Sequence, residues 1–283
     1  LGGIGVLLST SPLGLIAGTI GWRYAFFGAG AITALGALLI YLLVRDAPPG
    51  YVATTSAPEG LKESVKGVAE VVRTKHLPSV MFMAFASYPV LTSVLGLWGG
   101  PYMIDVHGLE TISSSNVLLL MAVALIAGNI VFGPLERILD TRKWLVVGCS
   151  LMVLVSFAIL ALVPEMPTAA AIALVGLIGF FSAYNIVITG HGRSLFPDRL
   201  AGRGMAMMAI ALMGGPAVMQ PATGLIMGAF PDVEGVAPNE AYRAMFGFLA
   251  GVVLLALLNY LRLPDARPSE GFAEDLQSPT PLP

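Results

Sequence analysis

The stretch WLVVGCSLMVLVSFAILALV, residues 144–163, contains no Asp, Glu, Lys or Arg. A helix of about 20 residues is long enough to cross the roughly 30 Å hydrocarbon core of a bilayer. The rest of the chain is similar in kind, because 56% of its 283 residues are hydrophobic and only 11% are charged. A soluble domain is about one quarter charged, and a soluble fold of this length could not bury so much apolar surface. The sequence therefore predicts an integral membrane protein.

Seven further stretches are apolar over a comparable length. They are continuous rather than alternating, and a strand of a membrane barrel would be about half as long. We therefore expect an all-α fold, a polytopic bundle of transmembrane helices. The eight expected spans are 1–20, 23–44, 79–104, 114–135, 144–163, 168–190, 204–230 and 241–262.

Lysine and arginine are distributed unevenly between the two sides of this arrangement. If the loop 45–78 is cytoplasmic, thirteen of them lie on that side and only Arg23 and Arg243 lie on the other. An excess of Lys and Arg marks the cytoplasmic loops of membrane proteins. We expect a multi-pass protein of a prokaryotic inner (plasma) membrane, with the central loop and the C-terminus in the cytoplasm.

The loop 45–78 contains a segment with helical periodicity. Leu61, Val65, Val68 and Val72 recur at the spacing of one helix face, and charged residues occupy the other side. We expect an amphipathic helix on the cytoplasmic face, and the alternative is a charged linker with partial helicity. The segment 264–283 is rich in Pro and acidic residues, and we expect a disordered cytoplasmic tail there.

Two distant parts of the chain resemble each other. GWRYAFFG at 21–28 has a counterpart in AYRAMFGF at 241–248, and each follows a Gly-Leu-Ile-x-Gly stretch, at 14–18 and 224–228. Small residues one turn apart let helices approach closely in lipid, while aromatic rings and Arg are typical of the membrane interface. We interpret the pair as an internal duplication, with chance as the alternative. On this interpretation the last six spans are one unit, and four helices precede the first residue.

The layout resembles the major facilitator superfamily, with GWR after the fifth helix and GPLERILDTRK at 133–143 after the eighth. The acidic position of that loop is shifted by one residue relative to the family pattern. The resemblance implies twelve helices, of which residues 1–44 hold the last two of the N-terminal half and 79–263 the C-terminal half. It also implies a conformational latch, and the alternative is a turn of ordinary cytoplasmic charges. The latch residues would be Glu136, Arg137, Arg142 and Lys143.

No span carries an Asp, Glu, Lys or Arg near its middle, so neutral polar residues must make any solute contact here. By the resemblance, the seventh, eighth, tenth and eleventh helices face the cavity, while the ninth, with Ser156, and the twelfth face lipid. Hydrogen bonding between helices is the alternative role for these polar groups. The candidate substrate-binding residues are Tyr88, Thr92, Asn129, Tyr184, Asn185 and Gln220.

The densest cluster of inner charges lies in HGRSLFPDRLAGRG, residues 191–204. We expect it to form a cytoplasmic gate, and attraction of an anionic solute to the inner mouth is the alternative. The three histidines lie in different loops or helix ends and predict no metal site. The gate residues would be Arg193, Asp198, Arg199 and Arg203.

The expected function is secondary active transport of a small solute by alternating access, in which two halves rock about a central site. The alternatives are a drug or metabolite efflux pump of the same superfamily and a non-transporting sensor or scaffold with the same fold. We expect no enzyme activity and no cofactor. The expected partners are a small-molecule solute, the lipid bilayer and protons or a counter-ion, without nucleic acid, and the expected state is a monomer.

Overall fold

The computed structural model describes residues 5, 16, 18–44, 61–232 and 235–269, with the side chains of 61–65 and 198 left out. The chain divides into two compact units, Leu1–Lys66 and Gly67–Pro283, and each is described on its own. The first unit contains α3. The elements from α4 onward are α4 (Leu61–Val72), α5 (Leu77–Ser93), the π-helical turn η1 (Val94–Trp98), α6 (Gly99–Asp105), α7 (Thr111–Ile138), α8 (Lys143–Leu162), α9 (Thr168–Ser182), α10 (Asn185–Ser194), α11 (Asp198–Gly228) and α12 (Asn239–Tyr260).

Every element in the described part of the chain is a helix, which confirms the predicted fold class. Seven helices there are long and apolar enough to cross a membrane. They are α3 (Trp22–Leu43) and six spans in the second unit, where α5, η1 and α6 form one span and α9 and α10 form another. The expected first span, 1–20, lies almost entirely outside the described residues.

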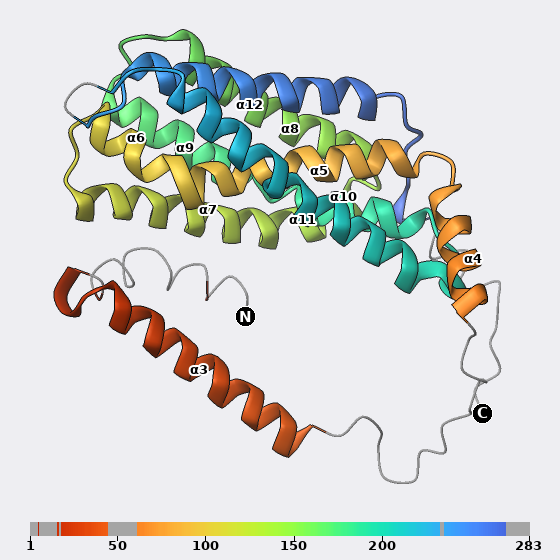
Figure 1. The fold of residues 1–283 in the computed structure, drawn as a ribbon. Coiled ribbons are helices and arrows are strands. Elements are labelled where there is room, and N and C mark those ends of the chain that lie inside the picture. The colour runs from red at the N-terminus through yellow and green to blue at the C-terminus, as the bar shows by residue number, and fades with distance from the viewer. Residues whose placement is uncertain (1–4, 6–15, 17, 45–60, 233–234, 270–283) are drawn as a thin grey trace. The chain divides into compact units, whose positions relative to one another are not determined.

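Within the second unit the helices pack side by side (Figure 1). The pair α8 and α12 is in contact, α9 packs against both α7 and α8, and α5 packs against α10, α11 and α12. Ser156 lies on α8, the helix expected to face lipid, and it belongs to the buried side of that helix. Ser156 is only 3% exposed, and its hydroxyl donates to the Met152 carbonyl of its own helix at 2.8 Å. A hydroxyl that bonds its own backbone is satisfied without a partner helix, so its presence does not reveal which side faces lipid.

Glycines set the closest helix contacts of this unit. A methyl group placed on Gly128 of α7 would lie 2.3 Å from the Phe180 carbonyl oxygen of α9, and one on Gly179 of α9 would lie 2.4 Å from the Met121 carbonyl oxygen of α7. Only a hydrogen atom fits at these positions, so the two helices touch backbone to backbone. By contrast, no heavy atom lies within 4 Å of the corresponding position on Gly224 or Gly228. The Gly-x-x-x-Gly motif singled out above is therefore not a contact point within this unit.

The predicted interface pair Tyr242–Arg243 is placed differently by the structure. Tyr242 is fully buried, its ring lies 5.4 Å from that of Tyr102, and its hydroxyl donates to the Asp105 carboxylate at 2.6 Å. Arg243 donates from Nε to the Ala161 carbonyl at 2.8 Å, where the last carbonyls of α8 lack helical partners. The pair thus joins α12 to α6 and to the end of α8, and Tyr242 is not an interface ring. Trp22, in the other unit, is exposed, with the Arg23 guanidinium 4.6 Å from its ring centre.

Candidate functional site

The span formed by α9 and α10 is interrupted near its middle. Ala183 and Tyr184 form a tight turn, in which their N–H groups donate to the carbonyls of Phe180 and Phe181 three residues earlier. Asn185 opens the second helix, and its amide donates to the Ser182 carbonyl at 2.9 Å. Because lipid offers no partner to a freed carbonyl, this side chain makes the break tolerable inside the membrane. Discontinuous helices of this kind supply the solute sites of many transporters.

The other end of the Asn185 amide contacts α5. Ser87 Oγ donates to Asn185 Oδ1 at 2.5 Å and also lies 3.1 Å from the Ala84 carbonyl. Ser87 is fully buried, whereas Asn185 keeps partial exposure. Sequence reasoning selected Asn185 and missed Ser87, because nothing in the sequence pairs two residues that lie 98 positions apart. The only signal in the sequence that could have indicated Ser87 was its position beside Tyr88, in the middle third of a span.

Proline shapes α5 at the same level. Pro89 lies inside the helix and cannot donate to the Phe85 carbonyl, four residues earlier, as another residue would. A methyl group on Gly215 of α11 would lie 2.2 Å from that same carbonyl oxygen and 2.9 Å from the Pro89 ring. The backbone of α11 therefore approaches α5 where α5 lacks its helical hydrogen bond. This close contact fixes the wall of the bundle next to Ser87.

The π-helical turn η1 lies further along the same span. It carries Trp98, whose indole N–H donates to the Thr223 hydroxyl of α11 at 2.9 Å, and that hydroxyl donates to the Gln220 carbonyl at 2.8 Å. Short π-helical segments inside α-helices are frequent at functional sites. This contact was not predicted from the sequence, and it places the backbone of Gln220 beside the irregular part of α5.

The remaining candidate substrate-binding residues, all within the described part of the chain, form no hydrogen bond between their side chains. Tyr88, Thr92, Asn129 and Gln220 are each half-buried, on α5, α7 and α11. The Thr92 hydroxyl lies 3.3 Å and 3.4 Å from the carbonyls of Tyr88 and Pro89 in its own helix. Half-burial leaves these four side chains some surface with which to contact a solute.

Tyr184 differs from the other candidates. Its side chain is 1% exposed and belongs to the apolar core, and its hydroxyl has no hydrogen-bond partner. A side chain without accessible surface cannot touch a solute in this conformation. The sequence predicted it as an aromatic ring beside the Asn185 amide, but its burial leaves it no surface with which to contact a solute.

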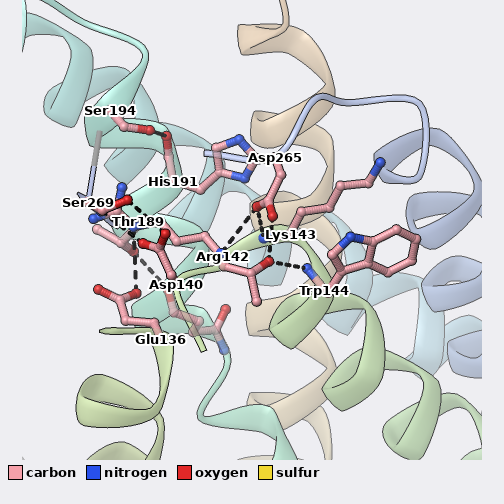
Figure 2. Close-up of polar contacts among 12 residues, drawn as sticks. Glu136, Asp140, Arg142, Lys143, Trp144, Thr189, His191, Ser194, Asp265 and Ser269 are labelled. Atoms are coloured by element: carbon pink, nitrogen blue, oxygen red, sulfur yellow. Dashed lines mark hydrogen bonds and ion pairs between the residues drawn. The ribbon is translucent and has the colours of Figure 1, made fainter. Parts of the chain in front are cut away.

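The turn between α7 and α8 holds the predicted latch (Figure 2). Arg142 Nε lies 3.7 Å from Glu136 Oε2, and the two side chains are 18% and 14% exposed. Both atoms lie over Gly190 of α10, at 3.5 Å and 3.6 Å from the position of a methyl group there. Of the four predicted latch residues, the structure brings together Glu136 and Arg142. Arg137 is exposed, and Lys143 places its Nζ 5.1 Å from the Trp144 ring centre.

A residue beyond α12 completes this turn, although sequence reasoning did not select it. The Asp265 carboxylate accepts from the Thr141 hydroxyl at 2.6 Å and from the N–H groups of Arg142 and Lys143 at 3.3 Å and 3.0 Å. The disordered tail was expected to begin at residue 264, so Asp265 departs from that expectation. Residues 270–283 lie outside the described part of the chain.

Asp265 should support this turn over the whole neutral range of pH. Burial opposes its ionisation, but hydrogen bonds from Thr141 and from the N–H groups of Lys143 and Arg142 outweigh burial and hold the pKa of the carboxyl below its usual 3.8. The stabilisation is therefore present above pH 3.8 and is lost as the pH falls through the lower, folded-state pKa. His191, Tyr260, Arg142 and Lys143 are the charged or titratable groups that face this region.

We expect Asp265→Asn to lower stability by about 0.3–1 kcal/mol, as for a lost charge at a helix N-terminus. Thermal unfolding of both proteins should give the same difference at pH 6 and pH 8, and the difference should shrink below pH 3.8. A difference that already halves between pH 8 and pH 5 would contradict the assignment.

The predicted gate residues contact α4 and their own loop. Arg199 forms an ion pair with Glu70 of α4, with nitrogen to oxygen distances of 3.1 Å and 2.5 Å. Its side chain is 64% exposed and that of Glu70 is 47% exposed, so solvent screens the pair and it contributes little to stability. Arg193 donates to the Phe196 carbonyl at 2.9 Å, and the Arg203 guanidinium lies against Gly67. The side chain of Asp198 lies outside the described residues.

The helix α4 spans Leu61–Val72, within the segment expected to be amphipathic. Its buried positions among the described side chains are Gly67 and Val71, whereas Val68 and Val72 are exposed. The described valines of the predicted apolar face, Val68 and Val72, thus remain exposed, and contacts of α4 with α11 are made by Gly67 with Arg203 and by Glu70 with Arg199. The position of this helix on the cytoplasmic face stays a prediction.

The described residues contain no group of three or more His, Cys, Asp or Glu side chains that could hold a metal ion. A comparison with family models gives one match, described as Major Facilitator Superfamily, over residues 1–192. No curated protein matches the chain.

Proposed function

Since the chain belongs to the major facilitator superfamily, a family of membrane transporters, we propose that it moves a small organic solute by secondary active transport with alternating access. The observation that carries this proposal is the pairing of Ser87 with Asn185 at the break between α9 and α10. Asn185 keeps partial exposure at an interrupted span, and discontinuous spans of this kind supply the solute sites of many transporters. Neutral amides and hydroxyls are the groups that recognise an uncharged or zwitterionic solute.

The proposed solute contacts are Asn185 with the half-buried Tyr88, Thr92, Asn129 and Gln220, while the buried Ser87 positions Asn185 and Tyr184 supports the set from the core. An aromatic side chain beside amides and hydroxyls suits sugars, amino acids or planar organic ions. Protons or a counter-ion would be coupled through residues outside this set, because the set carries no ionisable group of ordinary pKa near 7. Glu136 with Arg142 forms the proposed latch, and Arg193, Arg199 and Arg203 form the proposed gate.

We further infer the organisation of the halves. Residues 79–263 would form the C-terminal half, in keeping with the compact unit Gly67–Pro283, and residues 1–44 would end the N-terminal half. The central loop 45–78 and the C-terminus would face the cytoplasm, as the distribution of Lys and Arg supports.

Flux measurements test the proposal. The full-length protein is reconstituted into proteoliposomes and offered a panel of sugars, amino acids, organic anions and planar organic cations, with and without a pH gradient. We expect saturable flux for at least one class and a dependence of that flux on the gradient. Absence of saturable flux across the whole panel, for protein that is folded and correctly inserted, would overturn transport as the function and favour a sensor or scaffold.

A further inference from the structure

The turn between α7 and α8 is held by a segment far away in the sequence. Residues 261–269 follow α12 and return across the turn, where Asp265 accepts from the Thr141 hydroxyl and from two N–H groups of the first turn of α8 (Figure 2). A helix N-terminus presents N–H groups without partners. Arg142, at the start of α8, provides no side-chain cap of its own. Asp265 therefore serves as the N-terminal cap of α8, supplied from a position more than 120 residues away.

A second contact strengthens the first. Asp140 has a left-handed backbone conformation, with φ of 47°, which few residues other than glycine adopt readily. Its carboxylate accepts from the Ser269 N–H at 2.9 Å and from the Ser269 hydroxyl at 2.7 Å. Asp265 thus accepts hydrogen bonds from the turn, and Asp140 of the turn accepts hydrogen bonds from Ser269 of the returning segment. Together these contacts hold the backbone on both sides of Thr141.

Arg142 connects Asp265 to the predicted latch, because it contacts both Asp265 and Glu136. Asp265 fixes the Arg142 backbone N–H, while the Arg142 side chain extends to Glu136 of α7 at 3.7 Å. Neither Arg142 Nε nor Glu136 Oε2 has a hydrogen-bond partner, although both atoms are buried. Their position therefore depends on the backbone that carries them rather than on bonds of their own.

The ion pair in turn touches the helix that begins at Asn185. Glu136 and Arg142 pack over Gly190 of α10, one turn beyond Asn185. A methyl group at residue 190 would lie in ordinary van der Waals contact with both charged groups. The returning segment, the ion pair and the helix that carries Asn185 thus form one continuous series of contacts within the second unit.

We propose that Asp265 is the positioning residue for the Arg142–Glu136 ion pair, so that the segment after α12 holds the latch closed. The inference rests on the proposed function for its consequence in transport, but the coupling between the two sites is a property of the fold. Asp265 acts through the backbone of Arg142 and touches no solute.

A double-mutant cycle tests the coupling in the full-length protein in lipid nanodiscs. Asp265→Ala, Glu136→Gln and the double variant are compared by thermal unfolding. We expect each single change to lower the unfolding temperature by about 2–4 °C. Glu136→Gln should cost little more once Asp265 is removed, because the ion pair is then already lost. Additive effects of the two changes would overturn the proposal, since residues that act independently add.

Matched variants exclude a merely local effect. Glu110→Gln removes an exposed carboxylate at the start of α7 that makes no cap bond. Its effect should be no more than that of an exposed charge near a helix N-terminus, and it should be additive with Asp265→Ala. Asp265→Glu keeps the charge and should retain most of the stability. If Asp265→Ala does not fold, Thr141→Val removes one of the three bonds to Asp265, together with the bond from the Trp144 N–H to the Thr141 hydroxyl at 3.3 Å, and it should also be non-additive with Glu136→Gln.

Hydrogen exchange tests the cap itself, and flux tests its consequence for transport. Asp265→Ala should speed exchange of the Arg142 and Lys143 amides, and unchanged exchange would show that the cap does not exist. For the solute with saturable flux, Asp265→Ala should change the maximal rate, because a latch controls interconversion, and KM can change with it only through the population of the binding-competent state. An altered KM with an unaltered rate would contradict a positioning role. The cycle and the exchange need no solute, so a failure of the transport function is distinguishable from a failure of the coupling.

Discussion

Replacing Gly179 by alanine is expected to destabilise the bundle by about 1–3 kcal/mol, the usual cost of overpacking a tight contact. The added methyl group would lie 2.4 Å from the Met121 carbonyl oxygen and 2.8 Å from Met121 Cγ. A backbone oxygen cannot move aside as a flexible side chain can, so α7 and α9 must separate. Alanine also favours a helix over glycine by up to about 1 kcal/mol, which offsets only part of this cost. Thermal unfolding in nanodiscs measures the net effect.

Gly176 is a matched control on the same helix, one turn earlier. A methyl group there meets only Leu120 Cδ2, at 3.9 Å, which is ordinary van der Waals contact. Gly176→Ala should therefore leave the unfolding temperature unchanged or raise it slightly. If both variants behaved alike, the close contact between α7 and α9 would not be a determinant of stability.

Replacing Asn185 by alanine is expected to reduce solute flux by about tenfold or more. A neutral hydrogen bond contributes about 0.5–1.5 kcal/mol, 1.36 kcal/mol is a factor of ten in rate, and the Asn185 amide forms two hydrogen bonds. Its loss frees the Ser182 carbonyl at the helix break and removes the acceptor of Ser87. The initial rate of uptake into proteoliposomes, normalised to inserted protein, measures the effect.

Ser87→Ala and Ser156→Ala form a matched pair for the same assay. Both serines are buried in spans and lie within hydrogen-bond distance of a carbonyl of their own helix, but only Ser87 meets Asn185. We expect Ser87→Ala to lower flux severalfold and Ser156→Ala to leave it unchanged. Equal effects of the two substitutions would show that Ser87 acts through helix stability and not through the site.

At the candidate site, some residues could be predicted from the sequence and others could not, for physical reasons. Asn185 could be selected from the sequence because an amide in an apolar span must find a partner. Ser87 could not, since its role depends on which helix lies opposite. Tyr184, directly before Asn185 in the chain, is 1% exposed, while Asn185 keeps partial exposure. This difference depends on the helices that pack around the break, and the order of residues in the chain does not reveal it.

The sequence by itself determined the class of the protein, its six spans from residue 77 onward and its family, because transfer into lipid depends on the apolar content of each stretch of about 20 residues. Only the tertiary structure decided which polar groups meet. Ser87 with Asn185 and Asp265 with Thr141 lie 98 and 124 residues apart, and their meeting depends on how each helix is rotated about its axis. That rotation follows from close contacts such as Gly128 with Phe180 and Gly215 with Phe85, which have no signature in a chain where many glycines lie in apolar stretches.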